Sequence, residues 1–201
     1  YAGNILNIEK TMETTNGDPV AQIIEINGVE LTEEEKEKNK YATLGKALDY
    51  CNDLGIGTYK IQMLRDTFEA TNRIKEGQNI TIDLAGKSIK SDSTVIYNWG
   101  NLIILDSEKK DSIPENGIIS SKEEAIISYS KLTIGEKDNN EPFLSPKIET
   151  QGSMVNGIFI EEGELNFYDG IIKGAEGQQG YDVLDSSIKV DTPTYASVES
   201  Y

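Results

Sequence analysis

The sequence predicts an all-β fold, a right-handed parallel β-helix (solenoid) with an N-terminal capping helix. The first observation is a repeat: four short apolar strands with an inward, outward, inward alternation begin at residues 80, 102, 132 and 165. The second is the spacing of these strands, 22, 30 and 33 residues, which leaves room for several short strands and turns in each repeat. One such coil cannot bury its own apolar face, whereas stacked coils share one continuous core.

Residues 1–40 are expected to form an N-terminal hairpin and a charged linker, set apart from the β-helix of residues 41–201. Asn27-Gly28 lies between two apolar stretches, and both residues tolerate the positive φ angles of a tight hairpin turn. The charge run that follows contains Thr32 and Glu35 at the spacing of a capping box. This run fits a short solvated helix or a linker, so we place the domain boundary at its end.

From Thr43 onward the apolar residues take up helical spacing. Five of them recur on one face of a helix that Thr43 can begin and Gly55 can end: Leu44, Ala47, Leu48, Cys51 and Leu54. A stack of coils exposes its core and its unpaired backbone at an open end, so we expect this amphipathic helix to cover that end. A helix that binds a partner would show the same pattern, but a strand at residues 59–64 follows at once and favours the cap.

Within each repeat, two more strands accompany the aligned one. Apolar triplets precede three of the aligned strands, beginning at residues 95, 125 and 158, and a third strand begins at residues 86, 117 and 170. Three short parallel strands in each coil are the geometry of a parallel β-helix, whose crossovers are almost always right-handed. The longer coils carry extra polar residues at 109–116 and 136–146, which we expect in surface loops. After residue 175, a candidate strand at 187–190 indicates either a last coil or the start of a linker.

The charge and the missing histidine exclude several classes of function. The chain carries 35 acidic and 19 basic residues, and its net charge of −16 repels nucleic acid, so we expect no nucleic-acid partner. It contains no histidine, which removes imidazole acid-base catalysis, the Ser-His-Asp triad and most catalytic zinc sites.

The single cysteine and the first residue indicate a buried thiol and a longer parent protein. Cys51 falls in the helical pattern and should be a small buried apolar residue. No run of about 18 apolar residues is present, so we expect no membrane insertion. Because the chain begins with Tyr1 rather than Met, we expect it to be a piece of a longer protein with neighbouring domains.

An aromatic column is the first of two candidate surface sites. Trp99 and Tyr129 each lie three residues before an aligned strand, so in register they would lie about 4.8 Å apart on the outer wall. Stacked aromatic side chains can receive the C–H faces of sugars, which makes this pair a candidate ligand-binding site. Aromatic stacking also stabilises a β-helix wall without any ligand, and the next coil carries Glu162 at this position, so a structural role stays open.

An acidic column is the second candidate. Asp106, Glu136 and Asp169 follow the starts of three successive aligned strands by four residues. Like charges one rung apart repel each other unless a cation lies between them, and calcium prefers hard oxygen ligands. These residues are therefore a candidate calcium site, and the sequence indicates no other cofactor. Aspartate also commonly caps backbone N–H groups at a strand-ending turn, and this alternative stays open.

Between residues 41 and 174, a helix is followed by coils that share a G-x-L-x-I-x-D pattern. Four segments show this order: YATLGKALDYCND, ITIDLAGKSI, VIYNWGNLIILDS and KLTIG. This stretch resembles the pectate-lyase-like right-handed β-helix modules of cell-surface proteins from low-GC Gram-positive bacteria. The resemblance implies a secreted or cell-wall-attached repeat module, often one domain of a large adhesin-like chain. Its implied partners are host or cell-wall glycans or proteins and the neighbouring domains.

An enzyme is an alternative, because many β-helices cut acidic polysaccharides. The hydrolases of this fold resemble one another in clustered aspartates and a Gly-His-Gly element, which this chain lacks although Arg73-Ile74-Lys75 matches their Arg-Ile-Lys element. The lyases use calcium-binding acidic residues and a basic residue, but the only arginines, Arg65 and Arg73, precede the first aligned coil. We therefore predict a non-catalytic module for display or adhesion that binds glycans through a side wall. A polysaccharide lyase and a pure spacer are the alternatives.

Overall fold

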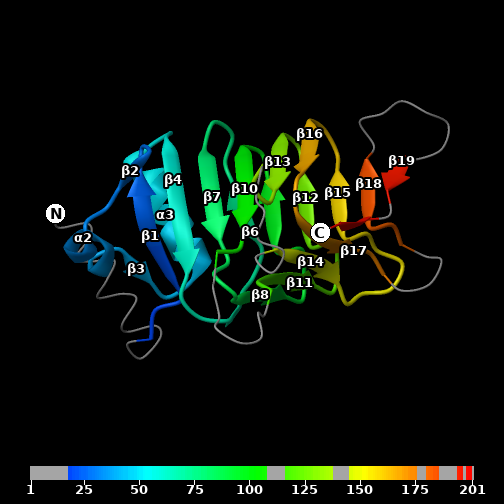
Figure 1. Cartoon of the computed structure of the whole chain (residues 1–201), viewed down its shortest axis with the longest axis horizontal. Helices are drawn as coiled ribbons and strands as arrows, with labels where there is room; N and C mark the ends of the chain where they lie inside the picture. Colours follow the sequence, from blue (N-terminus) through cyan, green and yellow to red (C-terminus); the bar gives the residue numbers. More distant parts are fainter. Residues whose placement is uncertain are drawn as a thin grey trace.

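The computed structural model describes residues 18–107, 116–137, 145–175 and 180–185, together with the backbone of two strands at 194–196 and 198–200. The described chain is mostly β-strand, and its strands form three sheets that share one interior (Figure 1). Successive coils follow one another along the long axis, from the N-terminal end at the left of Figure 1 toward the right. Sheets of stacked parallel strands support the predicted solenoid.

Sheet A contains the strands that the sequence repeat marks. Its order is β16-β13-β10-β7-β4-β1-β2, with β3 paired to β1. The parallel members are β4 (Thr58–Met63), β7 (Asn79–Asp83), β10 (Asn101–Leu105), β13 (Lys131–Ile134) and β16 (Glu164–Phe167). Leu102 lies opposite Leu132, and Leu132 lies opposite Leu165, so the predicted hydrophobic column is confirmed.

Sheets B and C supply the other two strands of each coil. Sheet B contains β5 (Thr67–Phe68), β8 (Ser88–Ser91), β11 (Ile118–Ser121), β14 (Lys147–Thr150), β17 (Gly170–Lys173) and β20 (Val198–Ser200). Sheet C contains β6 (Asn72–Ile74), β9 (Ile96–Asn98), β12 (Ile126–Ser128), β15 (Ile158–Ile160), β18 (Val183–Asp185) and β19 (Thr194–Ala196). The chain visits sheets A, B and C in turn, as the alignment predicts. Strands β5, β6, β14, β18, β19 and β20 are additions to that alignment.

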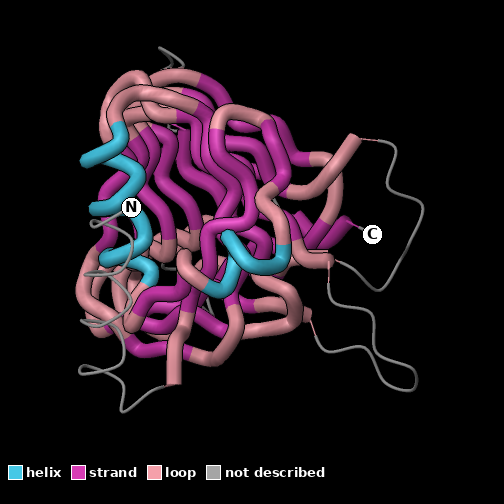
Figure 2. The backbone as a smooth tube through the Cα atoms, turned by 90° about the vertical axis from the view of Figure 1, so that its left-hand side faces the viewer, coloured by secondary structure: helices cyan, strands magenta, loops and turns pink. Residues whose placement is uncertain are grey.

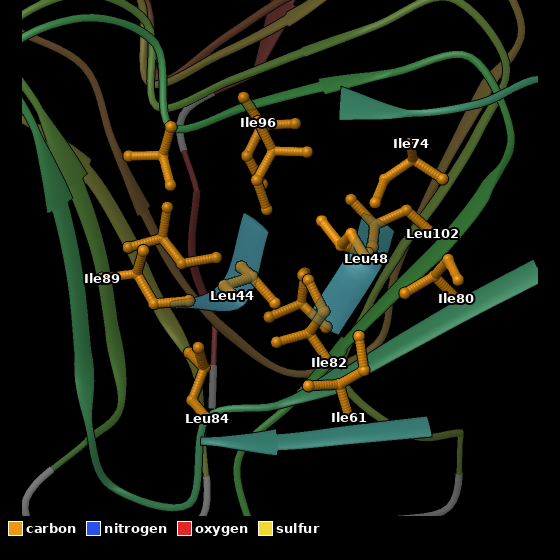
Figure 3. Close-up of a cluster of buried hydrophobic side chains, with 14 of the residues drawn as sticks. Leu44, Leu48, Ile61, Ile74, Ile80, Ile82, Leu84, Ile89, Ile96 and Leu102 are labelled. Carbon is orange, nitrogen blue, oxygen red and sulfur yellow. The ribbon is translucent and has the colours of Figure 1, made fainter. Parts of the chain in front are cut away.

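The interior is filled by aliphatic side chains from all three sheets. Figure 3 shows Ile61, Ile82 and Leu102 of sheet A facing the same space as Ile89 of sheet B and Ile96 of sheet C. All five side chains are fully buried. Because every second residue of a strand points inward, each coil adds its own set of such residues to this one core.

The N-terminal hairpin is present and joins sheet A. β1 (Ala21–Ile26) and β2 (Val29–Glu30) pair on either side of Asn27 and Gly28, which adopt φ angles of 52° and 78°. β1 also pairs antiparallel with β4, and β3 (Lys40–Tyr41) pairs with β1. Ile23 of β1 is fully buried in the common core. The domain boundary near residue 40 stays a prediction.

The predicted helix from Thr43 forms, and of the two alternatives for the charge run, a short helix and a linker, the structure shows the helix. In α2 (Glu33–Glu37), Thr32 and Glu35 make the reciprocal bonds of a capping box. In α3 (Leu44–Leu54), Thr43 Oγ1 accepts a hydrogen bond from Lys46 N at 3.0 Å, and the helix ends at Gly55. Figure 2 looks at the molecule from its N-terminal end and shows the helices in front of the stacked strands. The apolar face of α3 is buried except for its last residue, Leu54. The prediction placed Leu54 on this face, but its side chain is 46% exposed.

Two polar side chains from the first coil hold the two ends of α3. Glu69 accepts hydrogen bonds from the backbone N–H groups of Leu44 (2.9 Å) and Gly45 (3.1 Å), two of the donors that a helix N-terminus leaves without internal partners. Gln78 donates to Asn52 Oδ1 (3.0 Å) and to the carbonyl of Gly55 (3.1 Å) at the other end. Both side chains are buried. The helix is therefore fixed to the coils by polar contacts as well as by its apolar face.

The Cys51 thiol should be unreactive while the protein is folded. Cys51 is fully buried, as predicted, and burial raises the pKa of its thiol to about 12. Since the thiolate is the reactive form, we expect a disulfide reagent at mildly alkaline pH to react with the folded protein at least about 100-fold more slowly than with the urea-unfolded protein. The release of the reagent's chromophore measures both rates, and equal rates would mean that the thiol is accessible.

Some predicted features fall outside the described residues. The strand at 187–190 lies there completely, and the loops at 109–116 and 136–146 lie there for the most part. Among the helices in the described ranges, none combines the length and the hydrophobicity needed to cross a bilayer.

Candidate functional site

The candidate site lies at the corner where each strand of sheet C turns into the next strand of sheet A. Trp99 and Gly100 connect β9 to β10, and Tyr129 and Ser130 connect β12 to β13. A side chain at position 100 would not fit, because a Cβ atom there would lie 2.5 Å from the carbonyl oxygen of Gln78 in the coil before. Glycine thus lets the coils approach closely at this corner.

A buried asparagine fixes the turn that carries Trp99. Asn98 donates from Nδ2 to Ser128 Oγ (3.0 Å) and to the carbonyl of Lys131 (2.9 Å) in the next coil. Its Oδ1 accepts from Gly100 N at 3.0 Å. Because Asn98 is fully buried, these bonds satisfy its polar groups and hold two neighbouring turns in register.

The predicted aromatic pair is in direct contact. The rings of Trp99 and Tyr129 are parallel to within 2°, and their centroids lie 5.1 Å apart. Tyr97 stacks on Trp99 with a centroid distance of 5.7 Å, and the guanidinium of Arg73 lies 5.7 Å from the centre of the Tyr97 ring. Ring stacking and the cation–π contact fix the orientation of the whole series. Trp99 keeps 38% of its surface exposed, so the stack remains accessible.

A groove of about 490 Å³ lies beside the aromatic stack, and we call it the corner groove. Besides Trp99 and Tyr129, its lining consists of polar side chains and glycines: Glu76, Gly77, Gln78, Asn79, Gly100, Asn101, Ser130 and Glu162. Burial raises the pKa of Tyr129, and the charge of Glu161 adds to this effect, so its hydroxyl stays protonated near neutral pH. The corner groove therefore combines aromatic surface with hydrogen-bonding groups, which is the composition of many small-molecule sites.

The acidic column does not gather into one cluster. Asp106 is buried and accepts from the backbone N–H groups of Gly86 (2.8 Å) and Gly117 (2.5 Å). Asp169 is buried and accepts from Ser145 Oγ at 2.8 Å, whereas Glu136 is exposed. In the described part of the chain, no three acidic, cysteine or histidine side chains are placed to hold a metal ion. The bonds of Asp106 fit the alternative in which aspartate caps backbone N–H groups at a turn.

Arg73 and Tyr97 are the residues of this wall that the sequence interpretation missed. The alignment started at residue 80 and so placed Arg73 before the first coil, but β6 is a full member of sheet C and Arg73 lies opposite Tyr97. The sequence signal for these two residues is the apolar triplet before each aligned strand. Its residues alternate between the two faces of the sheet, so the middle or last residue of the triplet must point outward. Extending that alternation back by one coil would have placed both residues on the wall.

The chain matches no protein-family model, no curated protein and no solved structure.

Proposed function

We propose that this chain is a right-handed parallel β-helix capped by α3, and that it is a non-catalytic, secreted or cell-wall-attached module of a bacterial surface protein. In this proposal it serves in display or adhesion and binds glycans at the corner groove. The handedness rests on the rule that parallel strands joined by a crossover are almost always connected in the right-handed sense. The surface location rests on the resemblance of residues 41–174 to cell-surface β-helix modules.

The burial and the polar contacts of α3 support its role as a cap. Leu44 and Leu48 are buried against the first coil, and Glu69 and Gln78 hold the helix ends. A helix at this place covers apolar side chains and shields the end of the stack from another chain. An exposed end would instead be a site for aggregation.

One observation carries the proposed glycan binding, namely the parallel stack of Trp99 and Tyr129 beside a polar groove. The apolar faces of sugars pack on aromatic rings, and their hydroxyl groups need donors and acceptors close by. The corner groove offers both, since Asn79 and Ser130 line it together with the stack. A wall that used aromatic stacking for stability alone would not need the adjoining polar groove.

A glycan array tests this function. We expect the wild-type protein to bind at least one class of glycan, and we expect Trp99→Ala to weaken that binding about tenfold because it removes the centre of the stack. Tyr168→Ala is the matched control, since Tyr168 is another exposed aromatic residue and lines a separate groove of about 450 Å³ over sheet A. Binding that survives Trp99→Ala unchanged would contradict the proposed site.

A polysaccharide lyase is the second candidate function, and the position of Arg73 favours it. Arg73 lies on the same wall as the aromatic stack, where a basic residue could face an acidic sugar chain. A lyase would raise the ultraviolet absorbance of pectate or alginate in the presence of calcium, because it creates an unsaturated sugar. We expect no such rise. A pure spacer would show neither the absorbance change nor glycan binding.

A further inference from the structure

The charged residues of the corner groove are arranged along the solenoid axis. Glu76 lies in the turn of the first coil, Trp99 and Tyr129 lie in the next two turns, and Glu162 lies in the fourth. Neighbouring coils are about 4.8 Å apart, so the two carboxylates are separated by roughly 14 Å along the axis. The groove thus has aromatic surface in its middle and one negative charge at each end.

Among the described residues, the lining contains no cation to balance these charges. Neither lysine nor arginine is among the residues that line the corner groove, and the whole chain carries a net charge of −16. A polyanionic glycan such as a uronate chain would meet repulsion at both ends of the groove and from the field of the whole protein. A protonated amine would meet attraction from the same charges.

The hydrogen-bonding groups of the groove also favour a ligand that donates. The carboxylates of Glu76 and Glu162 are acceptors only. Asn101, which donates from Nδ2 to Asn79 Oδ1 at 3.2 Å, has its own Oδ1 buried without a hydrogen-bond partner in the described structure. A buried acceptor without a partner is costly, and a donor that reached the floor of the groove would relieve that cost.

We propose that the corner groove selects glycans that carry free amino groups, that is, oligosaccharides of unacetylated hexosamines. This inference rests on the proposed function and adds the class of ligand. The sugar chain lies along the solenoid axis, its rings contact the rim of the Trp99 and Tyr129 stack, and its ammonium groups pair with Glu76 and Glu162.

Three oligosaccharides of equal length test this selectivity: a chitosan tetrasaccharide, the fully acetylated chitin tetrasaccharide and a tetragalacturonate. At low salt, and at a pH at which the amines are protonated, we expect the chitosan form to bind at least tenfold more tightly than the chitin form. Tetragalacturonate should bind most weakly. The advantage of the chitosan form should shrink as salt is added, because salt screens exposed charges.

Glutamate-to-glutamine variants distinguish the effect of the groove carboxylates from the effect of the protein's net charge. We expect the double variant Glu76→Gln and Glu162→Gln to lose the preference for the amine while it still binds the acetylated form. The control is the double variant Glu25→Gln and Glu136→Gln, which changes the net charge equally but lies in the groove over sheet A. An equal loss of amine preference in both double variants would overturn the proposal. A preference for tetragalacturonate or for chitin would also overturn it, but would leave the proposed glycan binding intact. If none of the three sugars binds and the glycan array is also empty, the proposed function itself is wrong.

Discussion

Replacing Ile104 by alanine is expected to lower the free energy of unfolding by about 4 kcal/mol, because it removes three carbons from a closely packed core. Ile104 is fully buried and lies opposite Ile82 in one coil and Ile134 in the other, both of which are fully buried too. The cavity would therefore open between three layers, which cannot collapse without moving two neighbouring coils. Urea denaturation followed by circular dichroism measures the loss.

The neighbouring Ile103 provides a control of the same residue type. Its side chain points to the outer face and lines the groove over sheet A, and it is only partly buried. We expect Ile103→Ala to cost about 1 kcal/mol or less, because the alanine leaves a surface depression instead of a cavity. Similar losses for the two variants would mean that the inward, outward, inward alternation of this strand is wrong.

Replacing Glu69 by alanine is expected to lower the free energy of unfolding by about 2 to 3 kcal/mol. Hydrogen bonds to a charged group are strong, and removing the carboxylate leaves buried N–H donors without an acceptor. The variant leaves the N–H groups of Leu44 and Gly45 without their acceptor, and it also removes the bond from Thr67 Oγ1 (2.9 Å). The two backbone contacts join the first turn of α3 to the first coil, and the Thr67 bond lies within that coil. The measurement is chemical denaturation combined with hydrogen exchange of the α3 amides.

Two further variants show whether the position of the carboxylate matters. Glu69→Gln keeps one acceptor oxygen, so it should recover part of the stability that Glu69→Ala loses. Glu34→Ala removes an exposed carboxylate that pairs with Lys38 at 3.1 Å, and it should cost less than about 0.5 kcal/mol. Fast exchange confined to the α3 amides of Glu69→Ala would agree with a cap held by this residue. Unchanged exchange in α3 would contradict it.

The repeat was readable from the sequence because the strands are short and the aligned ones point alternate apolar side chains toward the interior. Alternation at a constant offset was enough to place Leu102, Leu132 and Leu165 in one column. The helix at 44–54 was readable for a similar reason, since its apolar residues change to helical spacing and Thr43 and Gly55 mark its ends. Strands β5 and β6 were missed because they contain only two and three residues and each buries few apolar side chains.

The acidic column shows what a register can and cannot predict. The alignment placed Asp106, Glu136 and Asp169 at equivalent positions, but these positions lie past the ends of the paired strands, where each turn takes its own path. A Cβ atom at Gly135 would lie 2.8 Å from Asp169, so glycine leaves room for this aspartate, while Glu136 is exposed. Equivalent positions in a sequence therefore share an environment only where backbone pairing continues.

By itself, the sequence determined the stacked coils, the buried hydrophobic columns, the hairpin and the helix at the N-terminal end, because periodicity and turn residues act over short distances. It also brought Trp99 and Tyr129 together, since both lie one residue after paired strands. Only the tertiary structure decided that Arg73 and Tyr97 extend the aromatic stack and that Glu76 and Glu162 close the two ends of one groove. Arg73 and Glu76 belong to the first coil, Tyr97 to the second and Glu162 to the fourth, and only the stacking of the coils brings them onto one wall.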